Sequence, residues 1–418
     1  MKGSGPMNRR LAEAVIATFR EADRDTHVQQ LACLEDRDWR RGLHWLDSSG
    51  LALYFGHRIK SSGLAECVSP EALEALDQRL ADNIQRTAEL FKEFEAINHA
   101  FQKAGVRYVN LKGFTLVPDY CPDPSLRCQF DLDFMISSSD LSPCQSILES
   151  FGYGVTGKHR NVVELKADSA QIPPIRDLYR PRRQRSVEVH FVPVRRGAPG
   201  SDNGLLSRLQ NRAWNGVSFP ALSDVDMFLG QANHLFRHLK SEWTRISWLL
   251  EFRTFVNARR EDTQLWQNVR NQIAADDESA LAVGTAVLLA TETFGEFGPP
   301  ELLEWSTDAV PRSVRVWLDR YGRTVLVSDF PGTKLYLLLE RELSSGGNAR
   351  KISWGKLFPL HRPPRIAYPK GQKSLRRMRA SLSQMWFALF RLRFHILEGS
   401  RYLIAVQQWK RRVDGQAV

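Results

Sequence analysis

The stretch Arg127-Cys-Gln-Phe-Asp-Leu-Asp-Phe-Met-Ile136 decides how this chain is interpreted. Side chains alternate across the pleat of a β-strand, so Asp131 and Asp133 would share one face with their Cα atoms ~6.6 Å apart. The opposite face would carry the apolar residues Phe130, Leu132, Phe134 and Ile136. Two carboxylates at this spacing can bind a pair of divalent cations, as in-line phosphoryl and nucleotidyl transfer requires. The stretch therefore predicts a strand with a core face and a metal-binding face.

The composition of the 418 residues is typical of a globular protein, with 43% hydrophobic and 25% charged residues. No apolar run approaches the ~18 residues of a spanning helix, so no transmembrane segment is expected. The first six residues, Met-Lys-Gly-Ser-Gly-Pro, lack the apolar core of a secretory signal. The five cysteines form no Cys-x-x-Cys pair, which argues against disulfides and structural zinc. We therefore expect a cytoplasmic protein.

The net charge of +11 is concentrated near the C-terminus. Residues 351–418 contain 15 Lys and Arg against two acids, so this segment carries +13 and residues 1–350 carry −2. Aromatic residues are interleaved with these cations, among them Trp386, Phe390, Phe394, Tyr402 and Trp409. Such a tail can bind RNA, an anionic membrane or an acidic partner, or its aromatic rings can pack against the rest of the protein. The sequence leaves these alternatives open.

Apolar spacing predicts helices toward both ends of the chain and strands between them. A long helix over 70–101 is expected to begin at Ser69-Pro70 and to stop before Gly105. The other expected elements are strands at 106–111, 130–136, 161–166 and 186–192, and helices at 112–122, 140–151, 224–239, 243–256, 280–293 and 375–409. The sequence thus predicts an α+β protein with a small mixed sheet flanked by helical regions.

Composition and element pattern divide the chain into four expected regions. These are an N-terminal helical region (1–100), a sheet-containing core (101–195), a C-terminal helical domain (196–345) and a basic, aromatic-rich tail (346–418). The break Ser344-Ser-Gly-Gly-Asn348 favours the last of these boundaries.

Two further segments carry residues that would complete a metal-dependent transfer site. Lys112-Gly113 follows the first expected strand, and a turn at a helix start can bind phosphate through free backbone amides. Glu188 lies inside the apolar strand 186–192, where a third carboxylate could hold the metal or accept a proton. His190 would face the same side as Glu188. We expect it to pack near the site or to contact the metal-binding residues without binding the metal itself.

Together, Leu111-Lys-Gly113, Arg127 with Asp131-Leu-Asp133, and Glu188-Val-His190 resemble the bacterial uncharacterised nucleotidyltransferase family of the polymerase-β-like superfamily. The resemblance implies a nucleotidyltransferase core that uses an NTP and two Mg²⁺ ions. It would transfer NMP to a hydroxyl of RNA, protein or a small molecule and release pyrophosphate. The resemblance assigns catalysis and metal binding to Asp131, Asp133 and Glu188, and nucleotide contacts to Lys112, Gly113, Thr115 and Arg127.

One position departs from the superfamily pattern, because Phe114 follows Gly113 where a second glycine or a serine is usual. Thr115 could supply the missing hydroxyl. Arg127 could also form a structural ion pair with Asp131 or Asp133. The alternative functions are therefore a non-catalytic module that binds nucleotide or RNA, and a scaffold protein that uses the aromatic tail.

Two other groups of residues have competing interpretations. The loop 173–186 could hold triphosphate or an acidic substrate, or it could simply be solvated; it contains Arg176, Arg180, Arg182, Arg183 and Arg185. His234 and His238 have a spacing that can bind zinc, but we expect a structural or hydrogen-bonding role. The motifs indicate no particular base, acceptor or oligomeric state.

Overall fold

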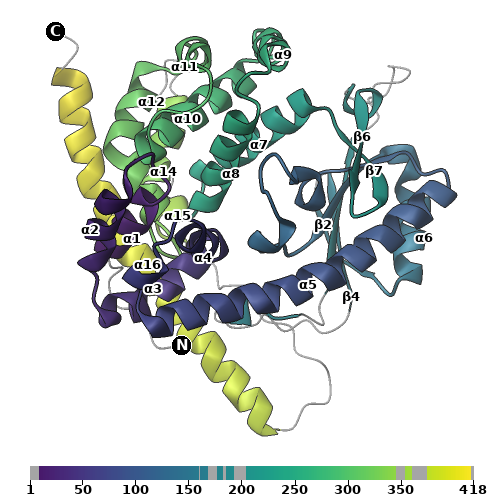
Figure 1. Ribbon diagram of the computed structural model, residues 1–418, viewed down its shortest axis with the longest axis horizontal. Coiled ribbons are helices and arrows are strands. Elements are labelled where there is room, and N and C mark those ends of the chain that lie inside the picture. Colours follow the sequence, from purple (N-terminus) through teal and green to yellow (C-terminus); the bar gives the residue numbers. More distant parts are fainter. Residues whose placement is uncertain are drawn as a thin grey trace.

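One mixed β-sheet and a large set of helices make up the described part of the protein (Figure 1). The computed structural model describes residues 9–159, 161–167, 177–181, 185–192, 204–344, 354–359 and 374–415. The strands are β1 (Tyr108–Asn110), β2 (Leu132–Ser137), β3 (Gly154–His159), β4 (Val162–Ala167), β5 (Arg185–Val192), β6 (Leu209–Trp214) and β7 (Val217–Leu222). The helices are α1 (Arg9–Ala17), α2 (Arg24–Ala32), α3 (Asp36–Ser49), α4 (Ala52–Ser61), α5 (Pro70–Lys103), α6 (Leu141–Ser150), α7 (Asp224–Leu239), α8 (Ile246–Ala258), α9 (Thr263–Ile273), α10 (Asp277–Phe294), α11 (Pro300–Thr307), α12 (Arg312–Trp317), α13 (Arg323–Val327), α14 (Tyr336–Leu343), α15 (Trp354–Leu357) and α16 (Ser374–Gly415). The predicted α+β class, with helices at both ends, is confirmed.

The sheet has the strand order β3-β4-β5-β2-β1-β7-β6. Strand β2 lies at its centre, parallel to β5 and antiparallel to β1. Strands β1, β2, β4 and β5 form where the sequence predicts them, whereas β3, β6 and β7 were not predicted. Strand β3 is almost entirely exposed, and β6 at the far edge has no buried residue. These edge strands lack the apolar face by which a strand is recognised in a sequence.

Helix α5 connects two hydrophobic clusters. Its start agrees with the prediction, because the Ser69 hydroxyl accepts a hydrogen bond from the backbone N–H of Ala72 and Pro70 occupies the first turn. Near this end Leu76 packs with helices from both ends of the chain, and farther along Phe94 and Ile97 pack beneath the sheet. With 34 residues the helix spans about 50 Å, enough to serve both clusters.

Helices α5 and α6 cover one face of the sheet, which leaves the other face for the polar residues of β2 and β5 (Figure 1). Leu132, Phe134 and Ile136 are buried on the covered face, as the alternation predicts. Phe130 is not part of that core. It precedes β2, and its ring lies 5.0 Å from the guanidinium groups of both Arg86 and Arg245. The predicted alternation therefore holds from residue 132 onward.

A single 3₁₀ turn, Gly113–Leu116, forms where a helix over 112–122 was predicted. The prediction was wrong because Gly113 has a left-handed φ of 68° and Pro118 has no amide hydrogen with which to continue a helix. Phe114 turns its ring into the core, with centroids 5.1 Å from Phe91 and 5.0 Å from Phe94. The side chain that departs from the superfamily pattern therefore lies beneath the turn.

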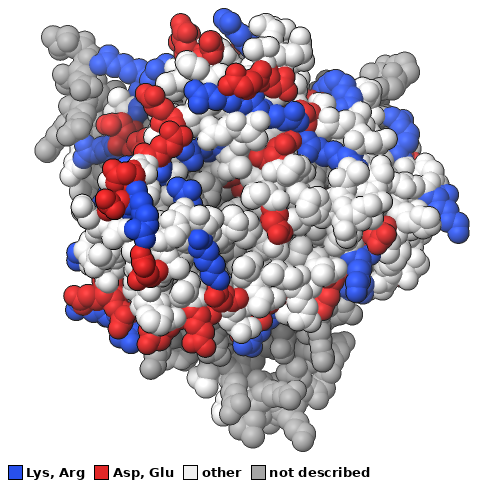
Figure 2. Space-filling model, in the orientation of Figure 1, with Lys and Arg blue, Asp and Glu red and all other residues white. Residues whose placement is uncertain are grey.

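Basic and acidic side chains are intermingled on the face shown in Figure 2, so the positive excess of the sequence is not gathered there. None of the helices in the described part of the chain combines the length and the apolar character that a bilayer crossing needs.

Candidate active site

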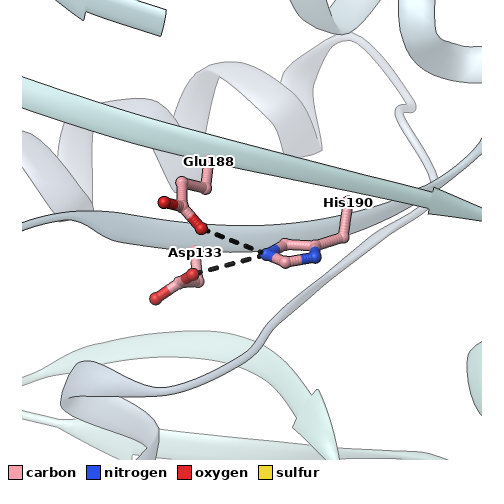
Figure 3. A group of neighbouring side chains, drawn as sticks. All are labelled: Asp133, Glu188 and His190. Carbon is pink, nitrogen blue, oxygen red and sulfur yellow. Dashed lines mark ion pairs between the residues drawn. The ribbon is translucent and has the colours of Figure 1, made fainter. Parts of the chain in front are cut away.

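Three side chains of metal-ligand type meet on the open face of the sheet (Figure 3). The parallel pairing of β2 with β5 places Asp133 opposite Glu188 and Met135 opposite His190, so all four share one face. The His190 Nε2 atom lies 3.4 Å from Asp133 Oδ1 and 3.6 Å from Glu188 Oε2. One ligand atom of each residue lies within 4.8 Å of the others. The three residues can therefore offer two carboxylates and an imidazole to one cation.

Asp133 is the most buried member of this acid cluster, with 7% of its surface exposed. Its Oδ1 accepts a hydrogen bond of 3.1 Å from the Lys112 ammonium group. Burial by itself would raise the pKa of Asp133, but the neighbouring His190 imidazole and the charge of Lys112 outweigh it and hold the pKa below its usual value. Asp133 is therefore ionised at neutral pH and has Lys112 and His190 as neighbours on two sides.

His190 belongs to the cluster itself, although we expected it only to pack near the site or to support it. Burial would lower the pKa of His190, but the carboxylates of Asp133 and Glu188 raise it above the ordinary value of 6.5. The signal in the sequence is the alternation Glu188-Val-His190, which places both side chains on one face of β5. An imidazole between two carboxylates lies where positive charge is best stabilised.

Asp131 immediately precedes β2 and is not one of the three clustered ligands. Asp131 is nevertheless within the electrostatic reach of the cluster: burial and the negative charge of Asp133 raise the pKa of Asp131 above its usual range, and Glu188 adds to the effect. Lys112 and Arg127 act in the opposite direction. A cation bound nearby would favour the ionised form of Asp131.

The Thr115 hydroxyl in the turn after β1 forms hydrogen bonds within that turn. The Thr115 hydroxyl is buried and donates to the backbone oxygens of Leu111 and Lys112, both at 3.2 Å. The side chain of Gln129 lies directly over Gly113, so a Cβ at position 113 would collide with it. Of the predicted turn residues, Lys112 is the one whose side chain reaches the acid cluster.

Arg127 forms its ion pair with Glu251 of α8, so the predicted structural pairing with Asp131 or Asp133 was wrong. The Arg127 Nε atom lies 3.1 Å from Glu251 Oε1, and Glu251 is 2% exposed. The same carboxylate accepts a hydrogen bond of 2.9 Å from the Tyr54 hydroxyl. The pair therefore joins the segment before β2 to helices α4 and α8.

A cavity of about 410 Å³ adjoins the acid cluster, because its lining includes Lys112, which donates to Asp133, and Met135, which pairs with His190 in the register of β2 and β5. Its other walls come from the segment before β6, from β7 and from α7, α9 and α10, with polar side chains that include Asp226, Asn233, Gln272 and Ser279. Sequence reasoning did not identify these residues, because they come from segments far apart in the chain and form no motif. The volume is sufficient for a small-molecule ligand.

The predicted histidine pair lies on helix α7. The ring centroids of His234 and His238 are 4.6 Å apart, and both rings pack against Trp248. Burial, Lys112 and neighbouring cationic groups lower the pKa of His234 to about 2, and burial with Arg237 and Lys112 lowers the pKa of His238 to about 4. Both imidazoles are therefore neutral at pH 7, and each has a ring neighbour.

The depressed histidine pKa values predict a loss of stability in mild acid. Because the folded pKa of His238 lies below its unfolded value of 6.5, stability is complete above pH 6.5 and decreases as the pH falls toward about 4. The slope is at most about 1.4 kcal/mol per pH unit for this residue. We expect His238→Gln to flatten the dependence of the melting temperature on pH between 6.5 and 4, measured by circular dichroism. The exposed His99, changed to Gln, is the control and should leave the slope unaltered; equal slopes for wild type and His238→Gln would contradict the prediction.

Only part of the predicted basic loop 173–186 is described, and Arg176, Arg182 and Arg183 lie outside the described residues. Arg180 pairs with Asp177 and Asp82, and Arg185 pairs with Glu93 of α5. The two described arginines thus have acidic partners outside the cluster.

The fold and the cluster define an α+β protein with a carboxylate-rich site on the open face of a mixed sheet. The model of the uncharacterised nucleotidyltransferase family matches residues 35–295, and the chain belongs to that family. The match extends from the start of α3 to the end of α10 and includes the acid cluster, Lys112 and the cavity. Membership supports a transferase with a nucleotide substrate in general. No curated protein matches the chain.

Proposed function

We propose that this protein is a Mg²⁺-dependent nucleotidyltransferase that transfers NMP from an NTP to an acceptor hydroxyl and releases pyrophosphate. The observation that carries the proposal is the convergence of Asp133, Glu188 and Lys112 on the open sheet face, beside a cavity of about 410 Å³. Asp131 adds a third carboxyl close by. Family membership supports the same class of reaction.

The side chains present fit a divalent cation. Asp133 and Glu188 offer the carboxylate oxygens that Mg²⁺ prefers, and we propose that Asp131, whose pKa both of these carboxylates raise, helps to hold a second ion. Lys112 and His190 already surround Asp133, as expected for a site that attracts positive charge. Bound Mg²⁺ would supply electrostatic stabilisation of the charge that develops on the phosphate oxygens. The proposal takes Asp131, Asp133 and Glu188 as ligands of two ions.

The chain's own residues then position the substrates and move the proton. The acceptor oxygen forms a bond to the α-phosphorus while the bond from that phosphorus to the β-phosphate oxygen breaks, and pyrophosphate departs. Glu188, which is less buried than Asp133, accepts the proton that the acceptor hydroxyl loses. Lys112 contacts the β- and γ-phosphates, since its ammonium group lies at the border between the acid cluster and the cavity. Its hydrogen bond to Asp133 orients it for this role.

The other assigned nucleotide contacts have weaker structural support. Gly113 could bind phosphate through its backbone amide, while Thr115 and Arg127 would have to exchange or share their present partners. We also propose membership of the polymerase-β-like superfamily, a cytoplasmic location, and the division into regions 1–100, 101–195, 196–345 and 346–418. The proposed acceptor is a hydroxyl on RNA, protein or a small molecule, and the loop 173–186 and the basic tail remain the predicted contacts for an acidic acceptor.

Transfer can be tested with each of the four NTPs, labelled at the α-phosphate, in the presence of Mg²⁺ and a cell extract. We expect one or more NTPs to label an acceptor, a chelator to abolish the labelling, and the same NTP labelled at the γ-phosphate to give none. Labelling from the γ-phosphate would instead indicate a kinase. Binding of NTP without any transfer would favour the non-catalytic module.

A further inference from the structure

Helix α16 has two faces of different character. On one face Phe394, Tyr402 and Trp409 are buried against the rest of the protein. Polar contacts secure the same face, because the Arg391 guanidinium lies 2.7 Å from a Glu242 oxygen and the Trp409 Nε1–H donates to Glu342 at 2.8 Å. The aromatic residues of the tail therefore serve partly in packing, one of the roles that the sequence left open.

The other face of α16 is apolar and exposed. Leu382, Met385, Leu389, Leu392 and Ile396 follow one another at alternating spacings of three and four, and each is between 46 and 55% exposed. At about 100° per residue they form one stripe, which lies opposite Phe394. Trp386, 64% exposed, widens the stripe. In Figure 1 the first half of this helix extends away from the other helices, below α5. A continuous apolar stripe of this length on a surface indicates a binding face.

The charge of the helix indicates what covers this face. The sequence of α16 contains nine Lys and Arg but only two acids, Glu398 and Asp414. Arg391 and Glu398 are engaged with the protein body, whereas Arg393 is exposed. A helix with an apolar face, an exposed tryptophan and an excess of basic residues has the composition of helices that lie in the surface of an anionic bilayer.

Two other occupants fit these features less well. RNA contacts basic side chains through its phosphates and aromatic rings through its bases. It offers no apolar surface that would cover a row of leucine side chains. A second copy of α16 could bury the stripe in a coiled coil, but such pairs use a narrow seam flanked by charges of opposite sign. Here the apolar face is wider than a seam, and pairing would bring two strongly basic helices together.

We propose that the exposed face of α16 attaches the protein to an anionic lipid surface. The leucine and methionine side chains of the stripe enter the boundary between headgroups and acyl chains, and the exposed Arg393 stays at the headgroups. The opposite face keeps its contacts with the protein body, so the attachment needs no rearrangement of the fold. This proposal is independent of the nucleotidyl transfer proposed above.

Flotation of the full chain with vesicles tests the attachment. We expect the wild type to float with vesicles of phosphatidylcholine mixed with phosphatidylglycerol, to release at high salt, and to stay behind with pure phosphatidylcholine. The triple variant Leu382→Gln/Leu389→Gln/Leu392→Gln keeps every charge but removes three apolar side chains, so its partitioning should be about 100-fold weaker. A matched control, Ile84→Gln/Val155→Gln/Leu303→Gln, changes three exposed apolar residues outside α16 and should float like the wild type.

Several outcomes would overturn the proposal. One is a wild type that does not bind anionic vesicles, or that binds neutral and anionic vesicles equally. Another is a triple variant that floats as well as the wild type while both melt at the same temperature. A wild-type dimer that the triple variant loses, without vesicle binding, would assign the face to a second copy. Salt-sensitive RNA binding that the triple variant loses, again without vesicle binding, would assign the face to RNA.

Discussion

Asparagine in place of Asp133 is expected to lower the rate of nucleotidyl transfer by about a thousand-fold, the upper range for removal of one preorganised electrostatic group. Asp133 is the centre of the cluster, since Lys112 and His190 both approach its Oδ1 atom. The amide has nearly the same shape but neither the negative charge nor the second acceptor oxygen that a cation needs. The rate is measured as label transferred from the NTP to the acceptor identified above, with excess Mg²⁺.

A control on the same sheet face separates this effect from a general loss of charge. Glu164 of β4 lies directly opposite Glu188 in the register, but its carboxylate is directed to His159 at 3.1 Å. We expect Glu164→Gln to retain most of the activity. Comparable losses in Asp133→Asn and Glu164→Gln, or full activity in Asp133→Asn, would remove the acid cluster from the reaction. Melting curves for each variant establish that the proteins compared are folded.

The central strands of the sheet could be predicted from the sequence because their local pattern and their environment agree. Leu132, Phe134 and Ile136 alternate with Asp131, Asp133 and Met135, and the buried position of β2 imposes that same alternation. The long helix α5 was predicted for a similar reason, since Ser69, Pro70 and Gly105 mark its ends through local backbone chemistry. Where local signals determine the structure, a single sequence is sufficient.

The shape of the site depends on contacts that no local signal contains. Asp133 meets Glu188 only because β2 and β5 pair in parallel, although they are 55 positions apart in the chain. Met227 lies on α7 and Gln272 on α9, and both line the cavity together with residues of the turn after β1. Strands β6 and β7 were not predicted, and they complete the sheet beside β1, with β6 at the edge. The alternation of side chains along β5, by contrast, is a local signal, and it was sufficient to place His190 on the same face as Glu188.

Removal of the Glu251 carboxylate is expected to destabilise the protein by about 3–5 kcal/mol, because the largely buried charge of Arg127 would be left without its partner. Arg127 and Glu251 are 124 positions apart, so their pairing is a tertiary contact that could not be predicted from either segment. The loss is measured as the change in the free energy of unfolding of Glu251→Ala, from urea titrations followed by circular dichroism. The Tyr54 hydroxyl also loses its acceptor in this variant, which acts in the same direction.

A double variant distinguishes a buried ion pair from a nucleotide-binding arginine. Replacing both partners with apolar residues, as in Arg127→Met/Glu251→Leu, removes the uncompensated charge, so most of the stability lost in Glu251→Ala should return. If Arg127 serves only to join the segment before β2 to α8, the double variant should also keep the KM for NTP. If it contacts phosphate as well, stability should recover while KM rises, because the double variant restores packing but not the positive charge. A double variant as unstable as Glu251→Ala would mean that the loss in the single variant comes from packing at Glu251 rather than from the unpaired charge of Arg127.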